Sequence, residues 1–294
     1  MTLATFLLPP LPQDTSYAAR SIPRNESPYL KLGDHIEEVL DGIAISAATC
    51  EDIRKAQSNL LYALISVFQY LEGFTDQQML DAITSRVDLK YALHLPLVYS
   101  SFNPNALCEF RQQVSQEADL RRAFQKLLDR LASFRFFRDE LGCDLTVAQI
   151  VDALCSANRF EAVVEAMYKT LEVIAATHAD WLRSIARPYW YIRYNLRARL
   201  ALTPSPPEKW QTITTEIAAD IQYFLEQIDH SSIETLVALP EVRELKQVWN
   251  DQFIRGDVEN FQKPPIVWRP TRCASCQRQE LAREEDLSEE NQGA

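Results

Sequence analysis

Polar side chains that could contact nucleic-acid bases lie along one predicted helix, residues 103–116. Asn103 is a preferred N-cap, and Pro104 stands at the first helical position, where a backbone amide is not needed. Leu107, Phe110 and Val114 fall on one stripe of this helix, which we expect to be buried. The side chains that we expect to face outward are Asn105, Glu109, Arg111, Gln112 and Gln116. Arginine can bind guanine, and asparagine or glutamine can bind adenine, through paired hydrogen bonds, so this face is suited to the DNA major groove.

An ordinary solvated helix carries the same residue types, and periodicity alone favours that simpler interpretation. The connection that precedes this helix, roughly residues 93–102, is also longer than the three or four residues of a compact helix-turn-helix. The pattern by itself therefore leaves both interpretations open.

Arginines that could contact phosphates occur in two further places. Arg121 and Arg122 lie on a predicted helix over residues 116–134. Arg193 and Arg197 belong to a second basic cluster, residues 183–199, in which arginines alternate with aromatic residues. Arginine and aromatic side chains together suit a surface that follows a nucleic-acid backbone or stacks a base. The alternative is that the aromatic residues are core anchors and the arginines are simply solvated.

Residues for metal or covalent catalysis are sparse. The four histidines show no metal-ligand spacing, and we find no phosphate-binding glycine loop or nucleophile elbow. Cys273 and Cys276 form a CxxC pair, half of a tetrahedral zinc site, with no second pair and no histidine after it. We expect a remnant or an exposed thiol pair without a metal, since zinc would require a partner chain or one of the distant histidines. Asp144 follows Gly142 and precedes an apolar run, so its type and position suit a helix cap.

The elements that must position these residues are predicted to be helices. Only six glycines occur in 294 residues, and long stretches carry apolar residues at helical spacing. The fold class is therefore all-α: a multi-helix N-terminal domain with a helix-turn-helix-like pair, then a second helical region, with strands minor if present. The first helix of the pair begins at Thr75, which forms a capping box with Gln78, and its apolar positions run to Val87. Other helices are predicted over 34–40, 51–71, 147–154, 160–176, 178–185, 208–228 and 242–253.

Three phrases resemble the N-terminal domain of bacterial insertion-sequence transposases of the DDE type. They are residues 75–81, residues 88–97 (DLKYALHLPL) and residues 102–111 (FNPNALCEFR). Fainter similarity continues to about residue 270, so the resemblance covers roughly residues 30–270. It implies sequence-specific binding of double-stranded DNA, at the terminal inverted repeats of a mobile element, during DNA transposition and recombination.

The same resemblance bears on catalysis. In that family two aspartates and a glutamate hold divalent metal ions, and Asp144 stands where the first aspartate would fall. The other carboxylates lie, in the family, beyond the point at which this chain ends, so we expect a chain truncated before its catalytic core is complete. Two ions about 4 Å apart need several carboxylates, so we expect no cleavage by this chain alone and no cofactor, with Mg²⁺ relevant only if another segment supplies the core.

Charge and organisation complete the set of expectations. The formal net charge is −11, whereas residues 77–138 carry nine basic and six acidic side chains, so DNA affinity should depend strongly on salt. We expect an extended Pro-rich arm over 1–32, a DNA-binding helical domain over 33–140, a helical insertion-like region over 141–270 and a disordered acidic tail over 271–294. A cytoplasmic protein with no membrane partner and a possible homo-oligomer are also expected. The alternative function is a helical protein-interaction or regulatory module derived from a transposase.

Overall fold

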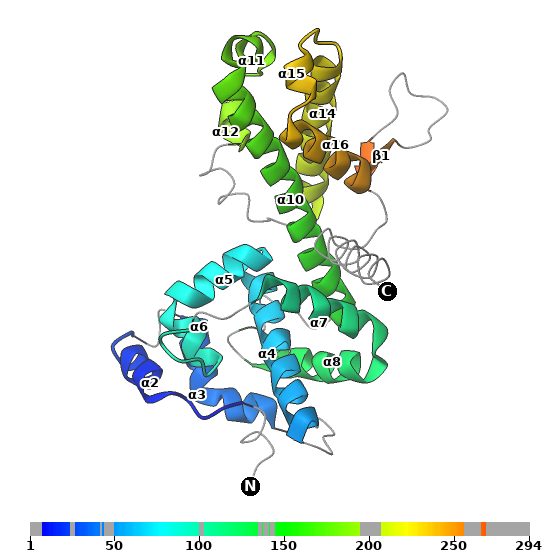
Figure 1. The fold of residues 1–294 in the computed structure, drawn as a ribbon. Helices are drawn as coiled ribbons and strands as arrows, with labels where there is room; N and C mark the ends of the chain where they lie inside the picture. The colour runs from blue at the N-terminus through cyan, green and yellow to red at the C-terminus, as the bar shows by residue number, and fades with distance from the viewer. Residues whose placement is uncertain are drawn as a thin grey trace, which may run out of the picture. The chain divides into compact units, whose positions relative to one another are not determined.

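The computed structural model describes two compact units, residues 1–154 and residues 155–294. The residues described are 8–23, 27–41, 43, 50–99, 103–134, 137, 141, 145–194, 207–255 and 266–268. Over these residues the chain is all-α, with thirteen helices and one pair of three-residue strands (Figure 1). No helix within these ranges is long and apolar enough to cross a lipid bilayer.

The first unit is built from seven helices and the beginning of an eighth. They are α2 (Gln13–Arg20), α3 (Pro28–Leu40), α4 (Cys50–Glu72), α5 (Asp76–Ser85), α6 (Val87–Ala92), α7 (Pro104–Gln116), α8 (Ala118–Ser133) and α10 (Val147–Thr177).

Several of these helices begin where the sequence supplies a cap. The Thr75 side chain accepts from the Gln78 amide while the Gln78 side chain accepts from the Thr75 amide, which confirms the capping box. Asn103 accepts from the Asn105 amide and fixes the start of α7. Ser27 does the same for α3, whose first residue is Pro28.

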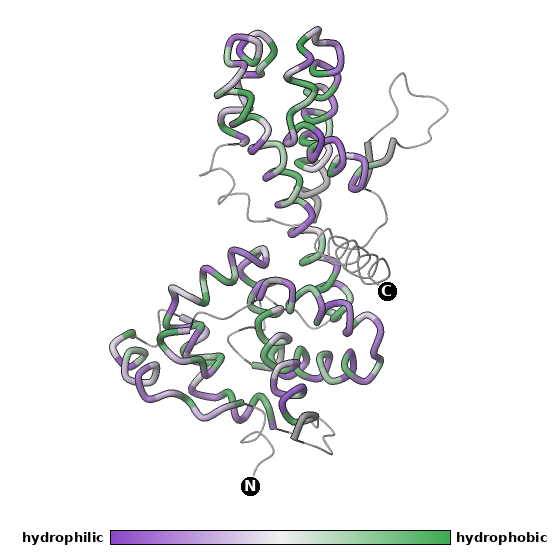
Figure 2. The backbone as a smooth tube through the Cα atoms, viewed as in Figure 1, coloured by the Kyte–Doolittle hydropathy of each residue, from purple (hydrophilic) through white to green (hydrophobic). Residues whose placement is uncertain are grey.

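The core of the first unit forms around α4, which packs against α5, α7 and α8. Leu64, Ile65 and Phe68 of α4 are fully buried. The apolar side chains that α5, α7 and α8 contribute to the same cluster are Met79, Ile83, Leu107, Phe110, Val114, Phe124, Leu127, Leu128 and Leu131. Figure 2 shows the corresponding hydrophobic stretches along these helices. The broad apolar face predicted for the helix over 51–71 is therefore confirmed.

The second unit has its own core. Its elements are the remainder of α10, α11 (Ala179–Ile185), α12 (Trp190–Tyr194), α14 (Pro207–Asp229), α15 (Glu234–Val237), α16 (Pro240–Gln252), β1 (Phe253–Arg255) and β2 (Ile266–Trp268). The two strands are antiparallel, with Ile254 opposite Val267. Met167, Ile221, Phe224 and Leu245 are fully buried in this core, and so is Trp190 at 3% exposure.

Three sequence-based predictions of local structure are wrong. Residues 1–32 are not an extended arm throughout, because they contain α2 and the first turn of α3. The helix that starts after Thr75 ends at Ser85, since Arg86 is extended, and α6 begins at Val87. The separate helices predicted over 147–154 and 160–176 are one helix of 31 residues, α10, which holds no glycine or proline. The tail over 271–294, with Cys273 and Cys276, lies outside the described residues.

Candidate nucleic-acid interface

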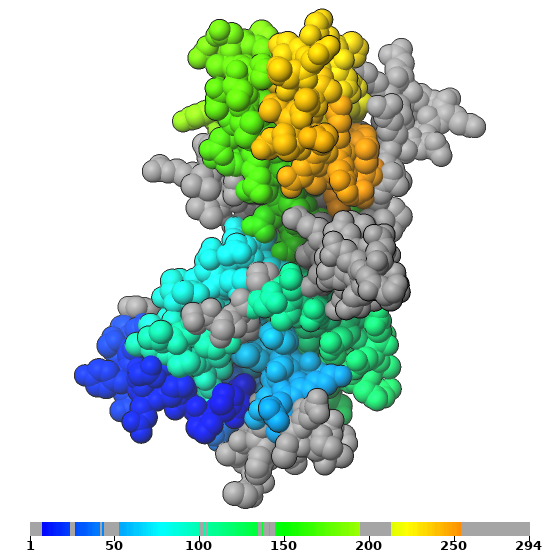
Figure 3. Space-filling view, viewed as in Figure 1, coloured from blue at the N-terminus to red at the C-terminus, as the bar shows by residue number. Residues whose placement is uncertain are grey.

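Helix α7 presents a polar stripe opposite its buried face. Leu107, Phe110 and Val114 are at most 1% exposed, which confirms that they face inward. Asn105 and Gln116 are exposed and Gln112 is half-buried, at positions 105, 112 and 116, which fall on one face of an α-helix. Glu109 shares this stripe and is also half-buried. Figure 3 shows α7 and α8 on the outer surface of the first unit.

Arg111 is not part of that stripe, and the prediction that it faces outward is wrong. Its side chain is 1% exposed, and its guanidinium donates to both carboxylate oxygens of Asp76, at 2.9 and 2.5 Å. The Gln69 side chain also donates to Asp76, at 2.8 Å. The physical reason is geometric: Arg111 borders the buried stripe of α7, and the first turn of α5 places a carboxylate within its reach. A bidentate pair of this kind is among the strongest side-chain contacts in proteins.

Asp76 and Gln69 are therefore functional-site neighbours that sequence reasoning missed. Together with Arg111 they join three helices, α4, α5 and α7, at one buried carboxylate. The signal in the sequence was weak, because an aspartate in the first turn of a helix is common on electrostatic grounds alone.

The polar side chains within residues 88–97 also make internal contacts that hold the fold together. Lys90 is 5% exposed, and its ammonium donates to the carbonyls of Thr84 and Leu97, at 2.7 and 2.5 Å. The Tyr91 hydroxyl donates to Asp34 of α3 at 2.8 Å. A buried charged group is stable only when hydrogen-bond partners satisfy it. The Lys90 and Tyr91 side chains therefore hold α6 in place and are not available to bind a ligand.

Asp88, at the start of the same phrase, connects α6 to the region before α3. It accepts from the Ser27 hydroxyl at 2.6 Å and from the Arg86 guanidinium at 3.1 and 2.8 Å. Burial raises the pKa of Asp88, but these hydrogen bonds and the charge of Arg86 outweigh burial, so the pKa lies below its ordinary value. Arg86 also pairs with Glu72 at 3.1 Å, and burial next to Glu72 raises the pKa of Tyr29.

Arg121 and Arg122 are exposed, as predicted, but the guanidinium of each also contacts another group of the protein. Arg121 donates to the carbonyls of Val114 and Ser115, at 3.1 and 2.7 Å, and so lies against the C-terminal turn of α7. Cations at a helix C-terminus are favoured by the helix dipole. Arg122 pairs with Asp119 one turn earlier, and its side chain remains 74% exposed. Of the two, Arg121 is the one placed beside the polar stripe of α7.

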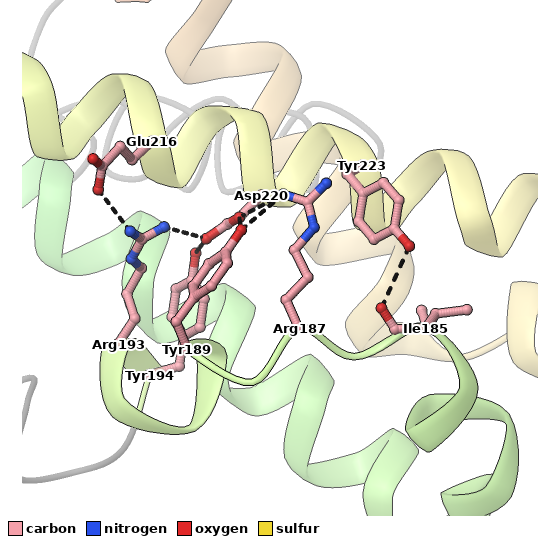
Figure 4. A network of polar contacts seen from close by, with 8 residues as sticks. All are labelled: Ile185, Arg187, Tyr189, Arg193, Tyr194, Glu216, Asp220 and Tyr223. Atoms are coloured by element: carbon pink, nitrogen blue, oxygen red, sulfur yellow. Dashed lines mark hydrogen bonds and ion pairs between the residues drawn. The ribbon is translucent and has the colours of Figure 1, made fainter.

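The second basic cluster is organised around Asp220 of α14 (Figure 4). Arg193 donates to Asp220 at 2.5 Å and to Glu216 at 2.6 Å. The hydroxyls of Tyr189 and Tyr194 donate to Asp220 at 2.9 and 3.1 Å.

Arg193 is therefore committed to an internal network, which corrects its interpretation as a free DNA contact. The Arg193 guanidinium is already paired with two carboxylates of α14, and the Arg193 side chain is 22% exposed. Burial opposes the charged form of Arg193, but Asp220 outweighs it and the pKa is raised. Burial and the neighbouring Asp220 both raise the pKa of Tyr194.

Arg187 keeps an exposed edge in the same cluster. Its guanidinium lies 3.4 Å from Asp220, donates to the Tyr189 hydroxyl at 2.8 Å and stacks over the Tyr223 ring at 4.0 Å. Trp190 and Tyr194 are at most 3% exposed, so the core interpretation of these aromatic residues is confirmed. Arg197 lies outside the described residues.

The candidate catalytic and metal-binding residues add little to this site. Asp144 lies outside the described residues. Within the described ranges, no group of three or more histidine, cysteine, aspartate or glutamate side chains could hold a metal ion. Cys108 of α7 is fully buried and disulfide-bonded.

Comparison with known families identifies part of the first unit. Residues 17–113 match a family model described as a transposase domain (DUF772). The matched span runs from within α2 to near the end of α7 and includes the contacts of Lys90, Asp76 and Arg111. No curated protein and no solved structure matches the chain. Over this span the first unit is therefore similar to a transposase domain.

Proposed function

We propose that this chain binds the terminal-repeat DNA of an insertion element, in a sequence-specific manner, as part of DNA transposition. The observation that carries the proposal is the exposed polar stripe of α7, which lies largely inside the span that matches a transposase domain. The opposite face of α7 is locked into the core by three apolar side chains and by the Arg111–Asp76 pair. In this proposal α7 acts as the recognition helix of a helix-turn-helix-like pair with α5.

Amides supply the base contacts in this proposal. Asn105, Gln112 and Gln116 can each bind an adenine edge through two hydrogen bonds, and each such pair discriminates by about 1–3 kcal/mol. With Arg111 buried, the stripe holds no guanidinium suited to guanine. We therefore infer that α7 prefers A·T-containing steps in the repeat.

Phosphate contacts come from the N-terminal half of α8. Arg121 is held at the C-terminal end of α7 and Arg122 extends into solvent one residue later. Two phosphate contacts predict that log K falls with log salt with a slope of about −2. Glu109 and the overall charge of −11 oppose DNA binding, so affinity should be measurable mainly at low salt.

The chain is proposed to bind DNA without a complete catalytic site of its own. One candidate aspartate, Asp144, is too few for a two-metal phosphoryl-transfer site. Cleavage of a terminal-repeat duplex in Mg²⁺ or Mn²⁺ that is lost in Asp144→Ala would overturn this part of the proposal.

The test of DNA binding is an equilibrium gel-shift titration at low salt with a terminal-repeat duplex and a shuffled duplex. We expect the wild type to prefer the repeat, and Asn105→Ala or Gln112→Ala to weaken binding by roughly 5- to 150-fold, since each loses about 1–3 kcal/mol. Gln77→Ala is the matched control, because Gln77 is an exposed amide on α5 that bonds only to Asp81 among the contacts observed. Equal affinity for both duplexes, or unchanged affinity in both stripe variants, contradicts the proposal.

A second candidate function, a protein-interaction module, is favoured by one observation in the second unit. Tyr191 and Ile192 of α12 are adjacent and are 81% and 69% exposed. Large apolar side chains exposed side by side are typical of protein contacts. Absence of DNA binding even at low salt, combined with concentration-dependent association that Tyr191→Ser reduces, would favour this function over the first.

A further inference from the structure

The segment before α2 and the first turn of α2 contact one turn of the chain that lies 80 to 85 residues away in the sequence. The Thr15 hydroxyl, fully buried, donates to the Leu95 carbonyl at 2.7 Å. The Leu97 amide donates to the Asp14 carboxylate at 3.2 Å, and Nδ1 of His94 donates to the Pro9 carbonyl at 2.9 Å. These bonds form a strap, residues 8–15, across the turn at residues 93–97.

Apolar contacts hold the strap at its first residue and, beyond its last residue, through α2. Leu8 is 5% exposed and belongs to the main core of the first unit. Ala19 of α2 packs with Leu30 and Tyr91 in a separate small cluster. The strap is therefore attached independently of its three hydrogen bonds to the turn.

The turn itself has a conformation that needs support. His94 has φ of 53°, in the left-handed region, which residues other than glycine adopt at a cost in free energy. Lys90 holds the turn from the α6 side through the Leu97 carbonyl, and the strap holds it from the other side. Residues in such conformations persist only where surrounding contacts over-determine them.

Residue 97 lies only six residues before Asn103, the cap of α7. An extended chain spans at most about 3.3–3.6 Å per residue, so the position of the turn limits where α7 can begin. Pro9, Asp14 and Thr15 precede residue 17, where the match to the transposase domain begins, whereas the turn and α7 lie inside it. The strap is thus outside the matched span but acts on it.

We propose that the strap is a positioning device that fixes the turn at residues 93–97 and thereby sets the orientation of α7 toward DNA. The proposal rests on the proposed function, because it assigns α7 a ligand. Release of the strap loosens the turn and the first turn of α7 while the core helices stay folded. Thr15 is accordingly a positioning residue.

The test uses Thr15→Val, which keeps the side-chain shape but removes the buried donor. Thr177→Val is the control, because the Thr177 hydroxyl also donates to a backbone carbonyl, that of Val173 within α10, and makes no contact with the strap or the turn among the bonds observed. Amide hydrogen exchange is followed at Leu95, Leu97, Ala106 and Leu107 in the full chain. We expect about tenfold faster exchange at these amides in Thr15→Val, the effect of losing one buried hydrogen bond, and no change in Thr177→Val. The same variant should lose several-fold in affinity for the terminal-repeat duplex.

Asp14→Ala, an exposed position, repeats the test if Thr15→Val does not fold. Unchanged exchange at Leu95, Leu97, Ala106 and Leu107 in the variant contradicts the proposed role of the strap. Faster exchange with full DNA affinity also overturns it, because α7 would then not depend on the turn. A wild-type chain that binds no DNA refutes the proposed function instead, and the exchange measurement still decides whether the strap positions α7.

Discussion

Among the described residues, each unit buries one aspartate among polar partners, but the arginines that pair with the two aspartates differ in exposure. In the first unit Asp76 binds Arg111 and Gln69, and the Arg111 side chain is 1% exposed. In the second unit Asp220 is equally buried, yet its partners Arg187 and Arg193 are 37% and 22% exposed. The first arrangement excludes water from both members of an ion pair, whereas the second keeps water on the cationic side.

The arginines of the two units therefore have different roles, which the sequence alone does not distinguish. Arg111 is a structural link between α7 and α5, and its charge is unavailable to a ligand. Arg187 and Arg193 attach the segment before α14 to α14 while retaining solvated edges. Because desolvation costs grow with burial, loss of one partner should be far more costly at Asp76 than at Asp220.

The largest effect is therefore expected from Arg111→Met. The substitution leaves the Asp76 carboxylate buried without its main cation, a change that costs about 3–5 kcal/mol when one member of a buried pair is removed. Urea unfolding of the variant measures the loss. The double variant Asp76→Asn with Arg111→Met should recover a good part of it, because the uncompensated charge is then gone. A loss below about 1 kcal/mol in the single variant would mean that water reaches Asp76.

A smaller effect is expected from Asp220→Asn. The amide cannot satisfy two guanidiniums and two tyrosine hydroxyls, but Arg187 and Arg193 can turn partly to water. We expect a loss of about 1.5–3 kcal/mol, the range for hydrogen bonds to charged groups. Unfolding followed by tryptophan fluorescence reports on it, since Trp190 packs beside Tyr194. A loss as large as that of Arg111→Met would remove the contrast between the two units.

Asp88 is an aspartate of intermediate burial whose contribution to stability should depend on pH. Its side chain is 13% exposed, and that of its partner Arg86 is 33% exposed. Its pKa is lowered in the folded state, so its stabilising effect is complete above the unfolded pKa of about 3.9 and is lost as the pH falls through the folded pKa. Asp88→Asn should cost about 1–2 kcal/mol at pH 7, as expected for partly solvated charged hydrogen bonds.

Thermal unfolding of wild type and Asp88→Asn between pH 7 and pH 2 gives the measurement. The stability difference should hold down to about pH 4, near the unfolded pKa, and shrink below it. A difference that grows as the pH falls would mean that the folded pKa is raised, contrary to the contacts with Arg86 and Ser27.

The fold could be predicted from the sequence wherever a local rule decides it. The capping box at Thr75 and the Asn103 cap with Pro104 placed α5 and α7 correctly, because these signals act within one turn of chain. The absence of glycine and proline over residues 147–177 also specified one helix, although its apolar pattern was interpreted as two.

The site was predicted less well because its polar contacts join distant segments. Arg111 lies at the edge of the buried stripe, and only the presence of Asp76, 35 residues earlier, decides that it turns inward. Asp220 lies 27 residues after Arg193, and no local pattern connects the two. Helical periodicity identifies a buried face but does not say which bordering charge finds a partner there.

The smallest change in stability, and the sharpest comparison between the units, comes from two matched surface pairs. Arg122 pairs with Asp119 in the first unit and Arg183 pairs with Asp180 in the second, both three residues apart, with arginine side chains 74% and 75% exposed. Exposed pairs of this kind contribute about 0–1 kcal/mol, so neither Arg122→Ala nor Arg183→Ala should shift the unfolding midpoint appreciably. If α8 contacts phosphate, Arg122→Ala alone should reduce the slope of log K against log salt by about 1, because each phosphate contact releases counterions. Equal slopes in the two variants would place the DNA-binding surface elsewhere than beside α7.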